Sequence, residues 1–411
     1  MTDARTRRWP PLRLAGGAGA GALLLLPVVV WPGLAQPFST PKLWLIALST
    51  LAMLSLTAVG GRGVPRRFAW LAGAWAASFV VSGAFGELPA FPDTLLGIAA
   101  PLFAVGLLRS GLAPARIVKA QVAGASVVAL VALLQWFGWD PFSSIGWYAP
   151  IEGASVRMRV YGTVGNPNFV GALMALTVPL TALLIVRAER HREHAAGVGS
   201  LVLLIGAMVA TGSRGAVLGL VAGAVTWASL RWSGRALMAV AVVVMVGTTV
   251  VALSPARPVQ TTLAGRVYLW QVVAPHAVAR PWVGQGPGAV SLQFAEWQHE
   301  ADARGISDPR FRGLTDHVHN DFLEALVERG LAGILTLMAP LVSAWLVARR
   351  HGRSGSVLVA SCTAAVVSGA TCAFVDFPLA RPVELVWWWT AVALVHAKGG
   401  PAPALGPLSR V

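Results

Sequence analysis

The segment Asp316-His317-Val318-His319-Asn320-Asp321, together with the mostly apolar residues 322–348 that follow it, decides how this chain must fold. An apolar stretch of about twenty residues or more is long enough to cross the hydrocarbon core of a bilayer as an α-helix. The polar residues before it then lie at a membrane boundary, where titratable side chains are costly and usually functional. Histidine is the side chain best suited to move a proton near neutral pH, so this segment is a candidate site for proton transfer.

The composition of the whole chain indicates a membrane protein. Of its 411 residues, 56% are hydrophobic and only 12% are charged, and the mean hydropathy is +0.67. A soluble domain carries about twice that fraction of charged residues. The sequence therefore predicts an all-α integral membrane protein that forms one polytopic domain over residues 1–411.

The net charge of +15 could indicate a nucleic-acid partner in a soluble protein. Here the basic residues cluster in short loops between apolar runs, so they indicate membrane topology, and we predict no nucleic-acid partner. The two cysteines, Cys362 and Cys372, lie in one apolar run and provide neither a disulfide framework nor a metal-binding spacing. Both are expected to pack as small apolar residues in a helix.

Twelve apolar stretches are candidate transmembrane helices. They cover residues 14–34, 43–60, 68–86, 92–108, 117–137, 167–186, 197–211, 215–230, 236–253, 322–348, 355–377 and 383–397. The first stretch follows four arginines and resembles a signal peptide, but its length favours an uncleaved helix. The seventh and eighth are short and separated only by Thr211-Gly212-Ser213-Arg214, so they are either two tilted spans or a re-entrant hairpin.

The distribution of lysine and arginine predicts that both ends of the chain are cytoplasmic. With the N-terminus inside, 20 of the 32 basic residues fall in cytoplasmic segments, and the short outside loops hold only Lys42, Arg157, Arg159, Arg214 and Arg381. The long loop 254–320 then faces outward. Within it, residues 265–273 and 289–304 are expected to form helices, joined by the turn-rich segment 281–288. We therefore expect a folded cap on the outer membrane surface.

Two arginines on this outer side are candidates for binding an anion. Arg214 lies between two apolar spans, where it must either snorkel to lipid headgroups or find an anion. Arg266 opens the first predicted helix of the loop and, taken alone, is equally explained as a solvated surface charge. Arginine holds phosphate through two parallel hydrogen bonds and stays charged. Two arginines that converge outside the membrane would suit a lipid-linked diphosphate.

Other polar residues near these arginines have structural explanations beside functional ones. Asn166 before Pro167 is typical of a helix start. Asp321, Glu324 and Glu328 have helical spacing and should share one face of the tenth span. His317 and His319 are expected to point in different directions and to have different roles. A metal site made by both histidines and Asp321 is an alternative, although His-x-His alone is weak evidence for zinc.

Seven short motifs, taken in order, resemble those of the O-antigen ligase and polymerase family of bacterial membrane glycosyltransferases. The resemblance covers residues 162–380. The motifs are Gly162-Thr163-Val164-Gly165-Asn166-Pro167-Asn168, Thr211-Gly212-Ser213-Arg214-Gly215, Arg266-Val267-Tyr268-Leu269-Trp270, Pro281-Trp282-Val283-Gly284-Gln285-Gly286-Pro287-Gly288, His317-Val318-His319-Asn320-Asp321-Phe322-Leu323-Glu324, Gly330-Leu331-Ala332-Gly333 and Asp376-Phe377-Pro378-Leu379.

The resemblance implies a GT-C-like fold of about twelve transmembrane helices, with a long, partly helical periplasmic loop between helices nine and ten. It implies transfer of a glycan from undecaprenyl diphosphate to a hydroxyl of lipid A-core, a growing polysaccharide or a protein. The transfer would invert the anomeric centre, without metal or cofactor, at the outer face of the bacterial inner membrane. His319 matches the family's general base, and Arg214 and Arg266 match its diphosphate-binding arginines. His317, Asn320, Glu324, Arg159 and Lys42 are possible supporting residues.

Two other functional classes are consistent with part of the sequence. Twelve spans suit a transporter or flippase for an anionic lipid-linked glycan, but transporters often contain internal repeats and ionisable groups near the bilayer midplane. In this chain the polar residues gather at the outer boundary, and no half-to-half repeat is evident. A non-catalytic scaffold would not need Arg214, Arg266 and His319 together.

Overall fold

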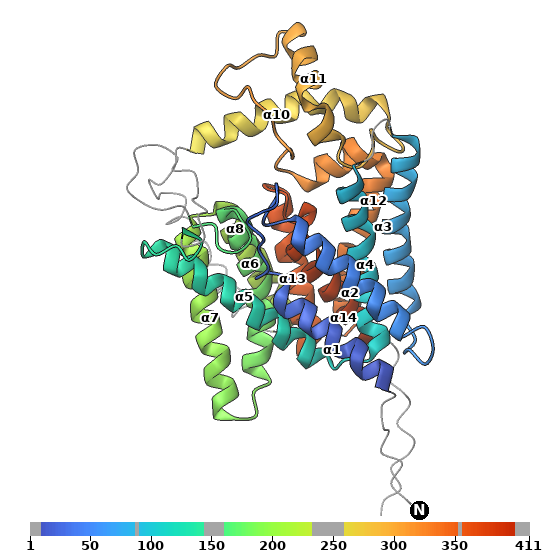
Figure 1. Ribbon diagram of the computed structural model, residues 1–411, viewed down its shortest axis with the longest axis vertical. Coiled ribbons are helices and arrows are strands. Elements are labelled where there is room, and N and C mark those ends of the chain that lie inside the picture. Colours follow the sequence, from blue (N-terminus) through green and yellow to red (C-terminus); the bar gives the residue numbers. More distant parts are fainter. Residues whose placement is uncertain (1–9, 87–89, 144–159, 232–258, 352–355, 399–411) are drawn as a thin grey trace, which may run out of the picture.

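The computed structural model describes residues 10–86, 90–143, 160–231, 259–351 and 356–398, and within these ranges the regular structure is helical (Figure 1). The α-helices are α1 (Pro10–Leu25), α2 (Thr40–Leu56), α3 (Arg66–Phe85), α4 (Phe91–Ser110), α5 (Pro114–Trp136), α6 (Pro167–Val186), α7 (His191–Thr211), α8 (Arg214–Arg231), α10 (Val259–Ala279), α11 (Ala289–Ala303), α12 (Asp321–Arg350), α13 (Val357–Ala373) and α14 (Pro382–Lys398). A short 3-10 helix, η2 (Pro378–Ala380), connects α13 to α14.

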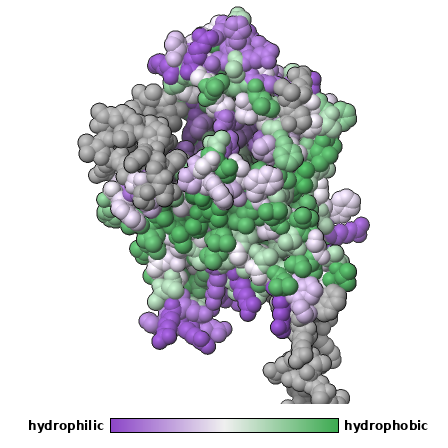
Figure 2. All heavy atoms as spheres, in the orientation of Figure 1, coloured by the Kyte–Doolittle hydropathy of each residue, from purple (hydrophilic) through white to green (hydrophobic). Residues whose placement is uncertain are grey.

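Several of these helices suit a membrane in both length and composition. Six are long and apolar enough to cross one, namely α3, α4, α5, α6, α7 and α12, and α2 and α13 are shorter apolar helices. Figure 2 shows apolar side chains around the middle of the molecule and hydrophilic ones at its two ends. The predicted all-helical, multi-pass membrane class is therefore confirmed. The count of twelve spans stays a prediction, and its ninth span, 236–253, lies outside the described residues.

Several predicted helix boundaries were wrong, and three of them are informative. The first helix ends at Leu25 instead of residue 34, because Pro27 cannot continue the hydrogen-bond ladder. Helix α7 begins at His191 instead of residue 197 and has 21 residues, because its first turn is polar and hydropathy alone leaves it out. At about 1.5 Å per residue it is roughly 31 Å long, so it is not a short span. Helix α13 ends at Ala373, four residues before the predicted end at 377.

Helices α7 and α8 each run the length of the bundle. The first turn of α7 meets the first turns of α5 through an ion pair of 3.1 Å between Lys119 and Glu193. At Gly212, in the left-handed conformation with φ of 62°, the chain turns back into α8. The last residue of α8, Arg231, returns to the end of the bundle where α12 finishes and α13 begins. This path favours two antiparallel helices over a re-entrant hairpin.

That end of the bundle carries many of the basic residues, and we call it the basic end. Its members in the described residues include Arg62, Arg66, Arg109, Arg116, Lys119, Arg187, Arg231 and Arg349. Some of them also join neighbouring helices, since Arg109 Nη2 donates to the carbonyl of Thr57 at 2.5 Å.

Residues of the predicted cap form a folded unit at the opposite end (Figure 1), and its position on the outer membrane surface stays a prediction. We define it as residues 259–320, which contain α10, α11 and the segment leading to α12. Its first helix, α10, is longer than the predicted 265–273, and its second, α11, matches the predicted 289–304 closely. The cap has a small apolar core of its own, in which Tyr268, Phe294 and Trp297 pack together with Val318 and with Val327 of α12. The cap core is therefore continuous with the start of α12.

The turn-rich segment 281–288 fastens the cap to a break in α12, and we call it the clip. At Gly330 the backbone of α12 leaves the helical conformation, with φ of 62° and ψ of −155°. The clip hydrogen-bonds to the backbone on both sides of this break: Leu331 N donates to Pro281 O at 2.7 Å, and Gly286 N donates to Glu328 O at 2.9 Å. Because these bonds satisfy groups that the broken helix frees, the break is stable without water.

Candidate functional site

The candidate site forms where the segment before α12 meets the segment between α13 and α14. Nδ1 of His319 lies 3.0 Å from Oδ1 of Asp376, which also accepts a hydrogen bond from the backbone N–H of Phe377 at 3.1 Å. The Asp376 side chain is 9% exposed, whereas the His319 side chain is 33% exposed. One ring nitrogen of His319 is thus held by a buried carboxylate, while the ring remains accessible.

The backbone around His319 is fixed on both sides. His319 has a φ of 55°, and among the described residues it is the one non-glycine residue with a positive φ. The next residue, Asn320, caps α12, because its side-chain oxygen accepts from the N–H groups of Phe322 and Leu323 at 3.0 Å each. The preceding Val318 is buried in the cap core, and its carbonyl accepts from the Trp270 indole at 2.9 Å. Such a strained residue persists only where its surroundings determine it, and it is typical of functional sites.

His317 lies beside His319 but has a different partner. Its Nδ1 is 2.6 Å from Oε1 of Glu324, and its ring stacks on Phe377 at a centroid distance of 4.3 Å. The ring of His319 meets the same Phe377 edge-on at 4.9 Å. The two rings thus meet Phe377 in different geometries and bind different carboxylates, while Val318 between them enters the cap core.

The two predicted anion-binding arginines approach this site from two other elements. Arg214 is the first residue of α8, and its neighbour Gly215 lies so close to Val375 that an added Cβ would be 2.8 Å from that side chain. Arg266 lies on α10 in the cap. Burial lowers the pKa of the Arg266 guanidinium, and the charge of the Asp376 carboxylate acts in the opposite direction. The start of α8 thus lies beside Val375, and Arg266 is close enough to Asp376 to interact with its charge.

Three helix N-termini also converge on this segment. The first turn of α6 contributes Phe169, whose ring packs against Phe377 at 5.1 Å. Helix α8 begins at Arg214, beside Val375, and α12 begins directly after Asn320. The N-terminus of a helix carries a partial positive charge. Together with the arginines, this arrangement suits an anionic group.

The other predicted supporting residues are not all at the site. Lys42 is almost completely buried, and its Nζ donates to the carbonyls of Val29 at 2.6 Å and Thr163 at 2.9 Å. It therefore joins the α1–α2 connection to the loop before α6. Asn166 caps α6 by accepting from Asn168 N at 2.9 Å, as predicted. Arg159 lies outside the described residues.

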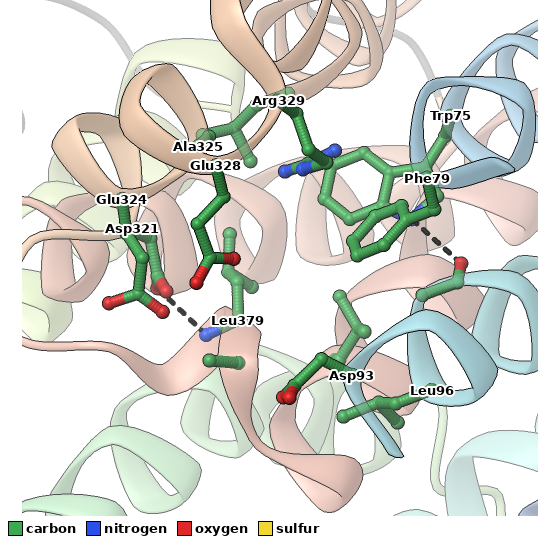
Figure 3. A pocket seen from close by; sticks show the side chains of 14 residues that line it. Trp75, Phe79, Asp93, Leu96, Asp321, Glu324, Ala325, Glu328, Arg329 and Leu379 are labelled. Atoms are coloured by element: carbon green, nitrogen blue, oxygen red, sulfur yellow. Dashed lines mark hydrogen bonds between the residues drawn. The ribbon is translucent and has the colours of Figure 1, made fainter. Parts of the chain in front are cut away.

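A cavity of about 50 Å³ is lined in part by Glu324, the partner of His317 (Figure 3). Asp321, Glu324 and Glu328 all line it from one face of α12, as their spacing predicted. Asp93 of α4 faces them, and this residue was missed because no motif surrounds it. Within the described part of the chain, no three His, Cys, Asp or Glu side chains are arranged to hold a metal ion. The predicted alternative, a metal held by both histidines and Asp321, therefore has no geometric support.

The segment 376–381 supplies the other residues that sequence reasoning missed. Asp376 and Phe377 belong to a noted motif, but nothing in the sequence gave either one a role. The backbone N–H of Leu379 donates to the Asp321 carboxylate at 2.8 Å, which joins this segment to α12. Arg381 was noted only as an outward-facing basic residue, and its guanidinium lies 4.7 Å from the centroid of the Phe377 ring.

The fold and the site define a multi-pass helical membrane protein with a histidine–aspartate pair and clustered arginines at its capped end. Residues 199–338 match the family model described as O-antigen ligase. These residues include Arg214, Arg266, His317 and His319. The exopolysaccharide production protein ExoQ of Rhizobium meliloti (strain 1021) is 30% identical over 244 residues, which are 55% of this chain and 53% of that protein. The match thus spans about half the length of this relative. Both findings support an O-antigen ligase/polymerase-like family, as the motifs predicted.

Proposed function

We propose that this protein is a membrane glycosyltransferase that moves a glycan from undecaprenyl diphosphate to an acceptor hydroxyl. The observation that supports this most is the His319–Asp376 pair, which lies where two arginines and three helix N-termini converge. Displacement of a diphosphate needs a general base for the acceptor and fixed positive charge for the leaving group. The acceptor is a hydroxyl of lipid A-core, of a growing polysaccharide or of a protein.

His319 is the general base in this proposal, and Asp376 orients it. When Nδ1–H donates to Asp376, Nε2 is left to accept the proton of the acceptor hydroxyl. The acceptor oxygen then forms a bond to the anomeric carbon as the bond from that carbon to the diphosphate oxygen breaks. The diphosphate leaves with the electron pair, and the anomeric configuration inverts. An orienting carboxylate of this kind also stabilises the imidazolium that forms.

Arg214 and Arg266 bind the diphosphate and stabilise the charge that develops on it. Neither a metal ion nor a cofactor takes part in the proposed step. Figure 2 shows a hollow between the cap and the bundle, with hydrophilic side chains inside it. The diphosphate and the sugars would occupy this hollow while the isoprenoid chain stays in the bilayer. A site with little water makes the fixed charges more effective.

The proposed topology places the basic end in the cytoplasm and the cap in the periplasm of a bacterium. Basic residues in short loops favour the cytoplasmic side of the inner membrane, and the basic end has this character. Both termini are then cytoplasmic, and the site faces outward, where polymerised glycans and lipid A-core are available.

The test is glycan transfer in proteoliposomes with a lipid-linked donor, without added metal. We expect His319→Ala to lower the rate about 10²–10⁴-fold, as is typical when a general base is removed. His299→Ala is the matched control, because His299 is an exposed histidine on α11 and should leave the rate unchanged.

Other outcomes would overturn parts of the proposal. Normal transfer by folded His319→Ala protein would remove the general base. Activity that a chelator abolishes would restore the metal alternative. A wild type that moves the donor across the membrane without transferring the glycan would support a flippase.

A further inference from the structure

Arg381 is a half-buried cation, with a buried Nε, that the proposed mechanism does not use. It lies at the outer end of α14, directly after η2. Its guanidinium carbon is 4.3 Å from the centroid of the Phe169 ring and 4.7 Å from that of Phe377. Two aromatic side chains thus hold the guanidinium in one orientation.

The guanidinium has no acceptor in the described part of the chain. Its Nε is buried without a hydrogen-bond partner. Unlike Arg310 and Arg312 of the cap, it also makes no ion pair within 4 Å of a described carboxylate. A buried donor of a charged group without a hydrogen bond is unfavourable, and contact with aromatic faces offsets only part of that cost. Because stacking uses the faces of the guanidinium and leaves its N–H groups available in the plane, an external acceptor can still bind.

The position of Arg381 indicates what this acceptor is. Phe377, against which Arg381 packs, also contacts both His317 and His319. Phe169, the other ring, lies in the first turn of α6, one of the three helix N-termini at the site. Arg381 therefore lies, like Arg214 and Arg266, near the segment around Asp376 that holds the proposed base, where acidic side chains also act on it.

We propose that Arg381 is a third diphosphate-binding residue, which donates hydrogen bonds to phosphoryl oxygens of the lipid-linked donor. This inference rests on the proposed function and extends its binding site. The aromatic pair fixes the guanidinium before the donor arrives, so little side-chain entropy is lost on binding. Three arginines on α8, α10 and the start of α14 would then surround the diphosphate from separate elements.

A competing explanation is that Arg381 only balances the carboxylates around it, of which Glu384 acts on it most strongly. This glutamate follows three residues later, is 1% exposed, and has one carboxylate oxygen without a hydrogen-bond partner. The two explanations differ in what a double substitution does. If Arg381 serves only to neutralise Glu384, removing both charges should restore diphosphate binding. If Arg381 binds the diphosphate itself, the double variant should still bind it weakly.

The experiment measures binding of undecaprenyl diphosphate, and of undecaprenyl monophosphate, to the purified full chain in nanodiscs. Arg381→Met keeps the apolar stem and removes the charge. We expect it to weaken diphosphate binding about 10–100-fold, the usual loss of a charge-assisted bidentate contact. Monophosphate binding should weaken less. The double variant Arg381→Met/Glu384→Gln should bind diphosphate as weakly as Arg381→Met.

Two results would overturn the inference while the proposed function stands. In the first, Arg381→Met protein binds diphosphate as tightly as the wild type, whereas Arg214→Gln protein binds it more weakly than the wild type. The other is a double variant in which binding returns to the wild-type value. A wild type that binds neither lipid would remove the proposed donor and this inference with it.

A second variant covers the case in which Arg381→Met does not fold, as judged by thermal unfolding. Arg381→Lys keeps the positive charge but loses the planar pair of donors. We expect normal folding with diphosphate binding weakened several-fold. Binding equal to that of the wild type would overturn the bidentate contact.

Discussion

The two parts of α12 on either side of Gly330 differ in their charge and in the exposure of their side chains. Before the break, residues 321–329 include four charged side chains that are buried: Asp321, Glu324, Glu328 and Arg329 are each less than 9% exposed. After it, residues 331–350 are mostly apolar, and several side chains are exposed where lipid would lie: Leu331 39%, Leu335 59%, Val342 46% and Leu346 49%. We call them the site half and the lipid half.

The difference shows that different interactions determine the positions of the two halves of one helix. The lipid half is placed by hydropathy alone, because apolar side chains are soluble in the bilayer. The site half is placed by partners that are distant in the chain. Asp321 accepts from Leu379 N, and Arg329 donates from Nη1 to Ser78 Oγ at 3.0 Å. Its buried charges are tolerated because these bonds satisfy them.

The largest effect we expect comes from separating the clip from the break that divides the two halves. In Gly284→Ala the new Cβ would lie 2.3 Å from the backbone of Glu328, and Gly284 has a φ of 72°. Backbone cannot move aside as a flexible side chain can, so we expect a loss above about 4 kcal/mol, which removes most of the folded protein. Fluorescence-detected size exclusion after heating in detergent measures this.

Two control glycines in the cap separate the clash from backbone strain. Gly305→Ala has a similar φ of 81° but no atom within 4 Å of the added Cβ, and Gly313→Ala has neither problem. We expect a cost of about 1–3 kcal/mol for the first and almost none for the second. If Gly284→Ala unfolds at the same temperature as Gly305→Ala, the clip does not hold the break.

The next effect concerns the carboxylates of the two histidines. Asp376→Asn should lower the transfer rate about 10²–10⁴-fold, because an amide does not hold the same tautomer of His319 or stabilise its protonated form. Glu324→Gln, the matching change at the partner of His317, should have a smaller effect on rate. The measurement is transfer in proteoliposomes as a function of pH, with Asp308→Asn on the cap surface as the control. Equal losses for the two partners would show that the histidines share one role.

How much of this site the sequence predicts depends on the distance between partners. Hydropathy placed the lipid half, and local patterns placed the Asn166 cap of α6 and the shared face of three carboxylates. The Asp376 partner of His319 is 57 residues away, so no local spacing could reveal it. The break at Gly330 was also unpredicted, because it depends on a backbone approach from the clip. Lys42 differs in the other direction: the sequence suggested a supporting role at the site, and the structure shows a buried side chain bonded to backbone carbonyls.

A smaller effect concerns the pH dependence of the cap that covers the site half. The ring of His276 in α10 stacks on Trp297 of α11 at 4.2 Å. Burial lowers the pKa of His276 from its usual value of 6.5, and the nearby Glu300 partly opposes this. Below that pH the unfolded cap binds a proton that the folded cap does not, so stability present above about 6.5 is lost on acidification.

Hydrogen exchange about one pH unit above and below that value measures this loss, after correction for intrinsic rates. We expect α10 and α11 to lose protection at the lower pH while the lipid half keeps it. His276→Phe should retain the stack on Trp297 and abolish the dependence. Loss of protection in both regions together would mean that the cap does not open by itself.

The smallest effect is expected in the lipid half. Leu335→Ala and Leu346→Ala remove side chains that lie 59% and 49% exposed on the outside of the bundle. In water such a change would alter exposed apolar area, but lipid tails are as apolar as leucine and fill the space that the side chain leaves. We therefore expect each substitution to change stability by less than about 0.5 kcal/mol in a bilayer, measured by thermal unfolding in nanodiscs.

A loss above about 1 kcal/mol would show that these side chains pack against protein, either the span predicted at 236–253 or a second copy of the chain. The lipid half would then depend on distant partners as the site half does, and hydropathy would have placed it without revealing what holds it.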